Sequence, residues 1–357
     1  MQDFTTKNTK WKTQRPQSFN SSLFFSLCAP RFPASANLAD KFNFLTIFLA
    51  ETSNLYLNTP AKIINLIYIF TAMLNFRFAR DYLLHRFKAK TRHGVHSPFV
   101  YRLIDEVIYD FEPKKVYGEV EALRKQLLND NRTINVIDLG AGSKVNNDQT
   151  KKISDIAQNA LKPPRLAQLL YRLAADLKPG NIIELGTCLG ITTIYLQKAA
   201  PKAKVYTLEG SPETAAVAFE TFKNAGLNST VQITGEFSDS ITLEVSSNES
   251  LNSIVEITGN FDDKLPGVIK ELDQLDFVFV DGNHQKDATL KYFEWCLPKV
   301  HENTLLIFDD IYWSEGMKQA WTEIKAHPKV TVTVDLFWIG LVFFKPGRVK
   351  ENFLIKI

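Results

Sequence analysis

The stretch "IIELGTCLGITT", residues 182–193, decides the fold of this chain. An apolar run ends at Glu184 and Leu185, glycines stand at positions 186 and 190, and we expect a helix to begin at the second glycine. A strand that passes through a glycine loop into a helix is the ligand-binding unit of doubly wound α/β sheets. The strand "KVYTLEG" follows and ends in Glu209, 19 residues after Gly190. This matches the roughly 20-residue distance at which an acid grips the hydroxyls of a ribose.

A second stretch, "NVIDLGAGSK" at residues 135–144, also places glycines after an apolar run. Two helical patterns follow it, and no strand with a terminal acid appears before residue 181. We therefore assign the ligand to the later loop. The earlier loop is predicted to be a turn in a helical region, whose residues could still touch a substrate.

The spacing of the glycines restricts the ligand. The loop reads G-T-C-L-G, with three residues between its glycines and no glycine in the middle. The G-x-G-x-x-G fingerprint brings a pyrophosphate onto a helix N-terminus, and a P-loop needs Lys followed by Ser or Thr. Both patterns are missing here, which favours a cofactor without a pyrophosphate.

Composition sets the broad class. Hydrophobic residues make up 45% and charged residues 23% of the 357 residues, and the formal net charge is +3. These values are typical of a globular protein and argue against nucleic-acid binding along the whole chain. Three scattered cysteines fit a reduced, cytoplasmic setting better than a disulfide framework. No apolar run reaches the ~20 residues that cross a bilayer, so we expect no membrane span.

Three regions are expected along the chain. Residues 1–72 predict either a poorly ordered extension or a segment upstream of a true start at Met73. Residues 73–178 predict a helical preface, and residues 179–357 predict the cofactor-binding domain with a C-terminal tail. Helices in the preface are expected over 98–111, 115–128, 150–161 and 164–177.

The second half alternates strands and helices, which predicts a Rossmann-like, doubly wound sheet of seven strands. The link between the sixth and the seventh strand is too short for a crossover, so the last strand must be antiparallel. A repeat, residues 228–241 and 252–265, matches at eight of fourteen positions with a spacing of 24. One copy must form the third strand, and we favour the second. The strands are expected at 181–185, 204–209, 230–234 or 254–258, 276–281, 304–309, 329–335 and 338–345.

The segments "IIELGTCLGITT", "VYTLEG", "FVFVDGNHQKD" and "LLIFDDIYW" together resemble the strand ends of class I S-adenosylmethionine-dependent methyltransferases. The resemblance covers residues 179–347. The preface, with "KAKTRHGVHSPFVY" at residues 88–101, resembles a set of uncharacterised bacterial methyltransferases. Within the class, the strand ends are similar to those of metal-dependent O-methyltransferases such as catechol O-methyltransferase.

The resemblance implies a cofactor site for S-adenosylmethionine. Carboxylates there would favour the ammonium and the sulfonium of the cofactor. Glu236 and Phe237 hold the same positions in the first copy of the repeat as Asn260 and Phe261 in the second, so either pair could contact the adenine. The implied cofactor residues are Glu184, Gly186, Thr187 and Gly190 toward the methionine, Glu209 and Gly210 toward the ribose, Asn260 and Phe261 toward the adenine, and Asp281 beside them.

The resemblance also implies a metal site and a base. In the metal-dependent enzymes an acid ends the fourth strand and an Asp-Asn pair ends the fifth; here Asp281, Asp309 and Asp310 match, with Asp310 replacing Asn. Oxygen ligands of this kind suit Mg²⁺ or another divalent cation. His284 stands where that family has a basic lysine, and an imidazole could take a hydroxyl proton near neutral pH. His284 could instead cap the next helix, and Tyr312 and Trp313 could wall the substrate pocket or pack in the core.

The sequence thus predicts methyl transfer from S-adenosylmethionine to a hydroxyl oxygen of a small molecule, with help from a divalent metal. The fourth strand ends in "DGNH" instead of the Asn-Pro-Pro-aromatic motif of enzymes that methylate exocyclic or amide nitrogens. The basic run at residues 77–92 keeps an RNA or protein acceptor as a second hypothesis, although we expect no nucleic-acid partner. A nicotinamide-dependent oxidoreductase and a non-catalytic cofactor-binding protein are the third and the fourth. A homodimer is left open.

Overall fold

The computed structural model describes residues 76–137, 149–227, 230–233 and 254–357. The predictions for residues 1–72, for the glycines of the loop at 138–143 and for Glu236 and Phe237 fall outside these residues. Within the described residues, no helix is long and apolar enough to cross a membrane.

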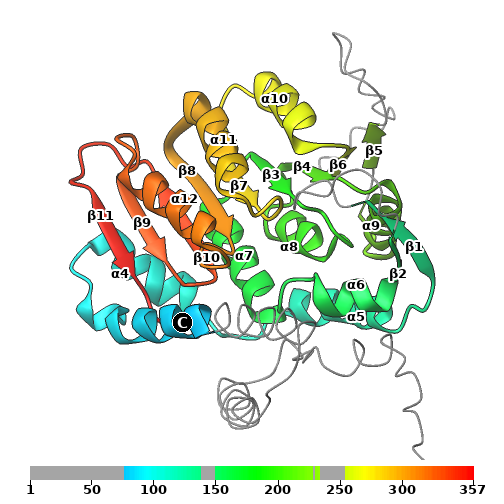
Figure 1. Cartoon of the computed structure of the whole chain (residues 1–357), viewed down its shortest axis with the longest axis horizontal. Helices are drawn as coiled ribbons and strands as arrows, with labels where there is room; N and C mark the ends of the chain where they lie inside the picture. The colour runs from blue at the N-terminus through cyan, green and yellow to red at the C-terminus, as the bar shows by residue number, and fades with distance from the viewer. Residues whose placement is uncertain (1–75, 138–148, 228–229, 234–253) are drawn as a thin grey trace, which may run out of the picture. The chain divides into compact units, whose positions relative to one another are not determined.

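The main sheet has nine strands in the order β11-β9-β10-β8-β7-β3-β4-β6-β5 (Figure 1). The seven predicted strands form its interior, and β10 runs antiparallel to both β8 and β9, which confirms the predicted doubly wound sheet. An extra parallel strand extends each edge: β5 beside β6, and β11 beside β9. The strands are β3 (Asn181–Leu185), β4 (Lys204–Glu209), β5 (Thr230–Ile233), β6 (Ile254–Thr258), β7 (Leu275–Val280), β8 (Val300–Asp309), β9 (Val332–Asp335), β10 (Ile339–Phe343) and β11 (Glu351–Leu354).

Both copies of the sequence repeat form strands. The second copy, β6, lies beside β4 in the place of the third strand, as predicted, and the first copy, β5, forms the edge next to it. The two pair in parallel, with Thr230 opposite Ile254 and Ile233 opposite Ile257. Equivalent positions of the two copies are therefore direct neighbours across the sheet.

Helices cover both faces of the sheet, as the apolar character of the strands on both faces requires. Alternate strand residues face opposite layers: Ile182 packs with α7, α8 and α9, whereas Ile183 packs with α10, α11 and α12. The preface contributes its apolar faces to the first of these layers. The helices are α7 (Pro164–Leu177), α8 (Ile191–Ala199), α9 (Pro212–Asn224), α10 (Phe261–Glu271), α11 (Lys286–Cys296) and α12 (Glu315–Ala326), with a short 3₁₀ turn at Leu297–Lys299.

The preface is helical with two departures from prediction. The helix expected over 98–111 begins as α4 (Pro98–Arg102) and continues as a π-helical segment, Leu103–Ile108. The helix expected over 150–161 is shorter, because residues 149–152 form a strand. This strand, β2 (Gln149–Lys152), pairs with β1 (Thr133–Val136) in a separate antiparallel hairpin. The other preface elements are a helical stretch over residues 76–88, a 3₁₀ turn at Arg92–Gly94, α5 (Lys115–Leu128) and α6 (Ile153–Asn159).

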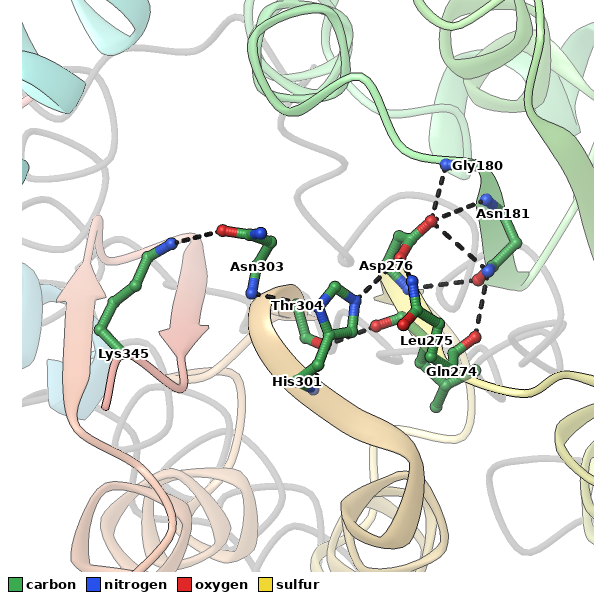
Figure 2. Close-up of polar contacts among 9 residues, drawn as sticks. All are labelled: Gly180, Asn181, Gln274, Leu275, Asp276, His301, Asn303, Thr304 and Lys345. Carbon is green, nitrogen blue, oxygen red and sulfur yellow. Dashed lines mark hydrogen bonds and ion pairs between the residues drawn. The ribbon is translucent and has the colours of Figure 1, made fainter. Parts of the chain in front are cut away.

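One carboxylate ties the amino ends of three strands together (Figure 2). Asp276 Oδ2 accepts hydrogen bonds from the backbone amides of Gly180 at 2.6 Å and Asn181 at 3.2 Å. Its Oδ1 lies 2.8 Å from Nε2 of His301 at the start of β8. Charged acceptors make stronger hydrogen bonds than neutral ones, so this network secures the relative positions of β3, β7 and β8. It lies at the opposite end of these strands from Glu209 and Asp281.

Candidate active site

The carboxyl ends of β3, β4 and β7 meet at one edge of the sheet. The amide of Gly186, after β3, donates to the carbonyl of Leu208 in β4 at 2.9 Å. The amide of Asp281, after β7, donates to the carbonyl of Leu185 at 2.8 Å. The strand order runs from β3 to β4 and β6 on one side, and to β7 and β8 on the other. This reversal is the switch point where ligands bind in open α/β sheets.

The two glycines after β3 are required by the backbone. Gly186 has φ +102°, and a Cβ added to it would lie 2.2 Å from the carbonyl oxygen of Asp281. Gly190 has φ +81° where α8 begins, and its Cβ would lie 2.5 Å from the ring of Phe222. Residues with a side chain rarely adopt such φ values. The loop therefore passes closer to β7 and α9 than any other residue would allow.

Glu209 joins the end of β4 to this loop. Its carboxylate accepts hydrogen bonds from the amides of Cys188 at 2.8 Å and Ser211 at 3.0 Å. Burial raises the pKa of Glu209, and these backbone donors oppose the shift. Glu209, to which the sequence spacing pointed, thus lies beside the glycine loop; the predicted contacts of Glu209 and Gly210 with a ribose stay predictions.

Glu184 and Thr187 lie beneath the loop. Glu184 is fully buried, and its Oε2 accepts hydrogen bonds from the hydroxyls of Thr193 at 2.5 Å and Thr207 at 2.7 Å. The hydroxyl of Thr187 lies 2.6 Å from that of Thr207. Burial raises the pKa of Glu184 to about 8. These side chains support the loop from inside the fold, and their predicted contact with a cofactor stays a prediction.

Asn260 and Phe261 follow β6, next to the loop after β7. The side chain of Asn260 caps α10 by accepting a hydrogen bond from the amide of Asp262 at 3.0 Å. The ring of Phe261 packs against Gly282, where an added Cβ would lie 2.6 Å from it. The structure therefore brings Phe261 to the site and gives Asn260 a structural task in the helix cap.

The predicted metal residues and the predicted base come together. Carboxylate oxygens of Asp281 and Asp309 and a ring nitrogen of His284 all lie within 4.8 Å of one another. Nε2 of His284 is 3.8 Å from Asp281 Oδ1 and 3.9 Å from Asp310 Oδ2. Burial raises the pKa of Asp309 to about 7, and the charge of Asp281 adds to this shift. Burial likewise raises the pKa of Asp281 and of Asp310 to about 6.

The structure assigns different roles to His284 and the two aromatic residues. The N-cap of α11 is Gln285, so His284 is not the capping residue. Tyr312 donates its hydroxyl to Asp335 at 2.9 Å and stacks on Phe337, which is the packing role. Trp313 is 64% exposed and is therefore available to a ligand.

Sequence reasoning missed Lys162, which lies among the acids. Its Nζ is 2.8 Å from Asp281 Oδ1 and is in contact with Asp309 Oδ2. Burial alone would lower the pKa of Lys162, but the attraction of Asp281, Asp309 and Asp310 outweighs it and raises the pKa. The one signal in the sequence was the excess of acids at two neighbouring strand ends. Such a cluster indicates a cation nearby, but it does not identify the residue or ion that supplies the charge.

A buried polar row crosses the sheet beneath the site. Glu184, Thr207 and Glu256 are neighbours on β3, β4 and β6. Glu256 is fully buried, and neither of its carboxylate oxygens has a hydrogen-bond partner within the described part of the chain. Burial raises the pKa of Glu256 from 4.5 to about 8, and the charges of Glu209 and Glu184 act in the same direction. This shift favours the protonated form of Glu256 in the folded chain.

Glu256 is expected to make folding less favourable as the pH rises. Between pH 4.5 and about pH 8 the folded chain keeps a proton on Glu256 that the unfolded chain has released. Stability therefore falls through this window by up to about 1.4 kcal/mol per pH unit. Relative to wild type, Glu256→Gln should gain about 2 kcal/mol or more in free energy of unfolding between pH 5 and pH 8, measured by urea denaturation without cofactor. Glu294→Gln, exposed on α11, is the control, and equal pH slopes for wild type and Glu256→Gln would contradict the expectation.

The described fold is a Rossmann-like doubly wound sheet whose candidate site lies at its switch point. Residues 183–311 match the family model described as "Methyltransferase domain". The chain is 32% identical to a catechol O-methyltransferase of Niastella koreensis over 151 residues, which are 42% of this chain and 57% of the relative. It is 24% identical to a catechol O-methyltransferase of Mycobacterium tuberculosis over 169 residues, 45% of this chain and 64% of that one. The chain thus spans less than two thirds of either relative.

Methyltransferases are among the solved structures with some similarity to this chain. The S-adenosylhomocysteine-bound methyltransferase PaMTH1 of Podospora anserina is similar at 15% identity and a TM-score of 0.44, over 70% of this chain and 97% of that one. The family match and the relatives confirm, for the matched residues, the predicted resemblance to class I methyltransferases and to the O-methyltransferases among them.

Proposed function

We propose that this chain transfers a methyl group from S-adenosylmethionine to a hydroxyl oxygen of a small molecule. The observation that carries the proposal is the junction at the switch point, where Glu209 binds the amide of Cys188 in the glycine loop. The loop after β7, with Asp281 and His284, touches the same glycine loop through Gly186. The residues that we propose to bind the cofactor and the candidate acid–base groups thus lie at the same edge of the sheet.

The residues present suit S-adenosylmethionine. Gly186 and Gly190 admit a ligand close to the backbone, and Glu209 ends β4 where a ribose would lie in a fold of this type. When bound, the cofactor supplies an electrophilic methyl group on a sulfonium. Glu209 would accept hydrogen bonds from the ribose hydroxyls, and Phe261 would pack near the adenine.

His284 is the group suited to take the proton of the acceptor. It is partly exposed, it follows the end of β7, and Asp281 and Asp310 lie 3.8 and 3.9 Å from its Nε2. A ring nitrogen in this position can accept the proton that the acceptor oxygen gives up. A metal fits less well: the donors are of the right kind for a hard cation, but the ammonium of Lys162 already contacts Asp281 and Asp309.

A small-molecule acceptor in a reducing compartment agrees with other features. Arg77 pairs with Glu315 at 3.6 Å, Arg92 pairs with Asp105, and Arg86 donates to the carbonyl of Ile357. Three basic residues of the run are thus paired within the chain, which supports the expectation of no nucleic-acid partner. Cys188 and Cys296 are free cysteines, and we propose a cytoplasmic location for this chain.

The proposal is tested by calorimetry with S-adenosylmethionine and S-adenosylhomocysteine. Wild type should bind both, and Glu209→Ala should bind them about 100-fold more weakly, because a charged hydrogen-bond partner of the ribose is lost. Glu294→Ala, exposed on α11, should bind like wild type. Turnover is then measured on a panel of hydroxylated acceptors that begins with catechol, since two relatives carry that name. A folded wild type that binds neither compound would refute the proposal.

A further inference from the structure

The carboxylates at the ends of β7 and β8 already enclose a cation. Asp281, His284 and Asp309 offer ligand atoms within 4.8 Å of one another, which is space for one positive centre. The Nζ of Lys162 contacts two of the three: it lies 2.8 Å from Asp281 Oδ1 and touches Asp309 Oδ2. The side chain of Asp309 is 1% exposed and that of Lys162 is 14% exposed. Water therefore does little to screen this pair.

The fold holds Lys162 in place. The residue directly precedes Pro163 and Pro164, and α7 begins at Pro164. The ring of each proline fixes φ, so the backbone after Lys162 has little freedom. The buried residues Ala167, Leu170 and Leu173 anchor α7 in the core. Lys162 is consequently delivered to the acids by a rigid segment.

Charge balance agrees with this position. Asp310 stands where the resemblance implies Asn, which adds a carboxylate to the site. Lys162 adds one positive charge, and its Nζ contacts the carboxylates of Asp281 and Asp309. A buried group of acids is stable only when a cation or protons match it.

We propose that the ammonium of Lys162 is the cation of this site, in the place that a divalent metal takes in metal-dependent O-methyltransferases, so that methyl transfer here needs no metal. This rests on the proposed function. An ammonium has three N–H donors, and Asp281 and Asp309 take two of them. In the proposed reaction the third would donate to the acceptor oxygen as negative charge develops on it.

The reaction then balances without a metal. The acceptor hydroxyl gives its proton to His284, and its oxygen forms the new bond to the methyl carbon. The carbon–sulfur bond breaks, and its electron pair stays on sulfur as the sulfonium becomes a neutral thioether. Lys162 remains protonated throughout and serves as a hydrogen-bond donor.

Manganese binding tests the proposal independently of turnover. Protein freed of metal with EDTA is titrated with Mn²⁺, and the signal of free Mn²⁺ is followed by electron paramagnetic resonance. Wild type should show no binding tighter than about 1 mM. Lys162→Ala should bind at least tenfold more tightly, because the acids lose their cation. Lys162→Arg should resemble wild type, and the double variant Lys162→Ala, Asp309→Asn should lose the gained affinity. Lys202→Ala, exposed before β4, is the matched control.

Micromolar binding of Mn²⁺ by wild type would overturn the proposal, since the metal would then displace the lysine. This titration needs no variant, so a Lys162→Ala protein that fails to fold leaves the proposal open to refutation. Equal Mn²⁺ affinities of a folded Lys162→Ala and wild type would also overturn it. Binding of S-adenosylhomocysteine to wild type is measured in parallel, once in EDTA and once with added metal. If the compound binds under neither condition, the proposed function is refuted. If it binds with metal and does not bind in EDTA, the metal-free site is refuted.

Discussion

Replacing His284 with alanine is expected to lower kcat for methyl transfer by about 10²–10⁴-fold, the contribution of a positioned general base. His284 lies 3.8 Å from Asp281 and 3.9 Å from Asp310, beside the glycine loop, and it does not cap a helix. The loss should therefore fall on the chemical step. Affinity for S-adenosylhomocysteine, measured by calorimetry, should stay within about twofold of wild type.

The control for this experiment is His301→Ala. His301 belongs to the network around Asp276 at the other end of the strands, so its removal should affect stability and leave kcat near the wild-type value. A His284→Ala enzyme with unchanged kcat would show that another group takes the proton. A parallel loss of cofactor affinity would instead make His284 a structural residue.

Replacing Gly186 with alanine should disrupt both the fold and cofactor binding. The new Cβ would lie 2.2 Å from the carbonyl oxygen of Asp281, at a φ of +102° that residues with side chains rarely adopt. Strain of this kind and overpacking each cost roughly 1–3 kcal/mol, so we expect a loss of about 3 kcal/mol in free energy of unfolding. Urea denaturation measures the loss, and affinity for S-adenosylhomocysteine should fall by more than about 100-fold.

Gly118→Ala provides the matched control. Gly118 lies inside α5, and an added Cβ there meets nothing within 4 Å. The same substitution should therefore stabilise the protein by about 0.5–1 kcal/mol, because alanine favours the helix. If both variants lose stability equally, the close approach of the loop to β7 is not the cause.

The parts of the fold that follow a regular pattern could be predicted from the sequence. α5 and α7 begin and end where the apolar stripes do. β3 matches the apolar run that precedes the glycine loop, and β4 matches the run that ends in Glu209. The hairpin of β1 and β2 was missed, because a short strand that pairs outside the main sheet carries little periodic signal. β11 belongs to the main sheet, but it is a strand of four residues at the sheet's edge and carries as little periodic signal.

Candidate site residues could be predicted where a reactive side chain stands directly at the end of a strand. Asp281, Asp309 and Asp310 close neighbouring parallel strands, and such ends meet at one edge. Lys162 was not predictable in this way, because it lies in a loop and its partner Asp309 is 147 residues further along the chain. Only the packing of α7 brings them together. The hydrogen bonds of Glu184 to Thr193 and Thr207 could not be predicted from the sequence either, and its contact with a cofactor stays a prediction.

The paired copies β5 and β6 have a consequence for how such proteins can grow. In their register, each residue of β5 pairs with the residue 24 positions later in β6. The edge strand β5 therefore has the same backbone pairing pattern as its inner neighbour. Copying a strand outward in this manner widens the sheet without reordering β3, β4, β7 and β8, which bear the reactive groups. The rim is thus a region where evolution can add material while the chemistry at the centre is left undisturbed.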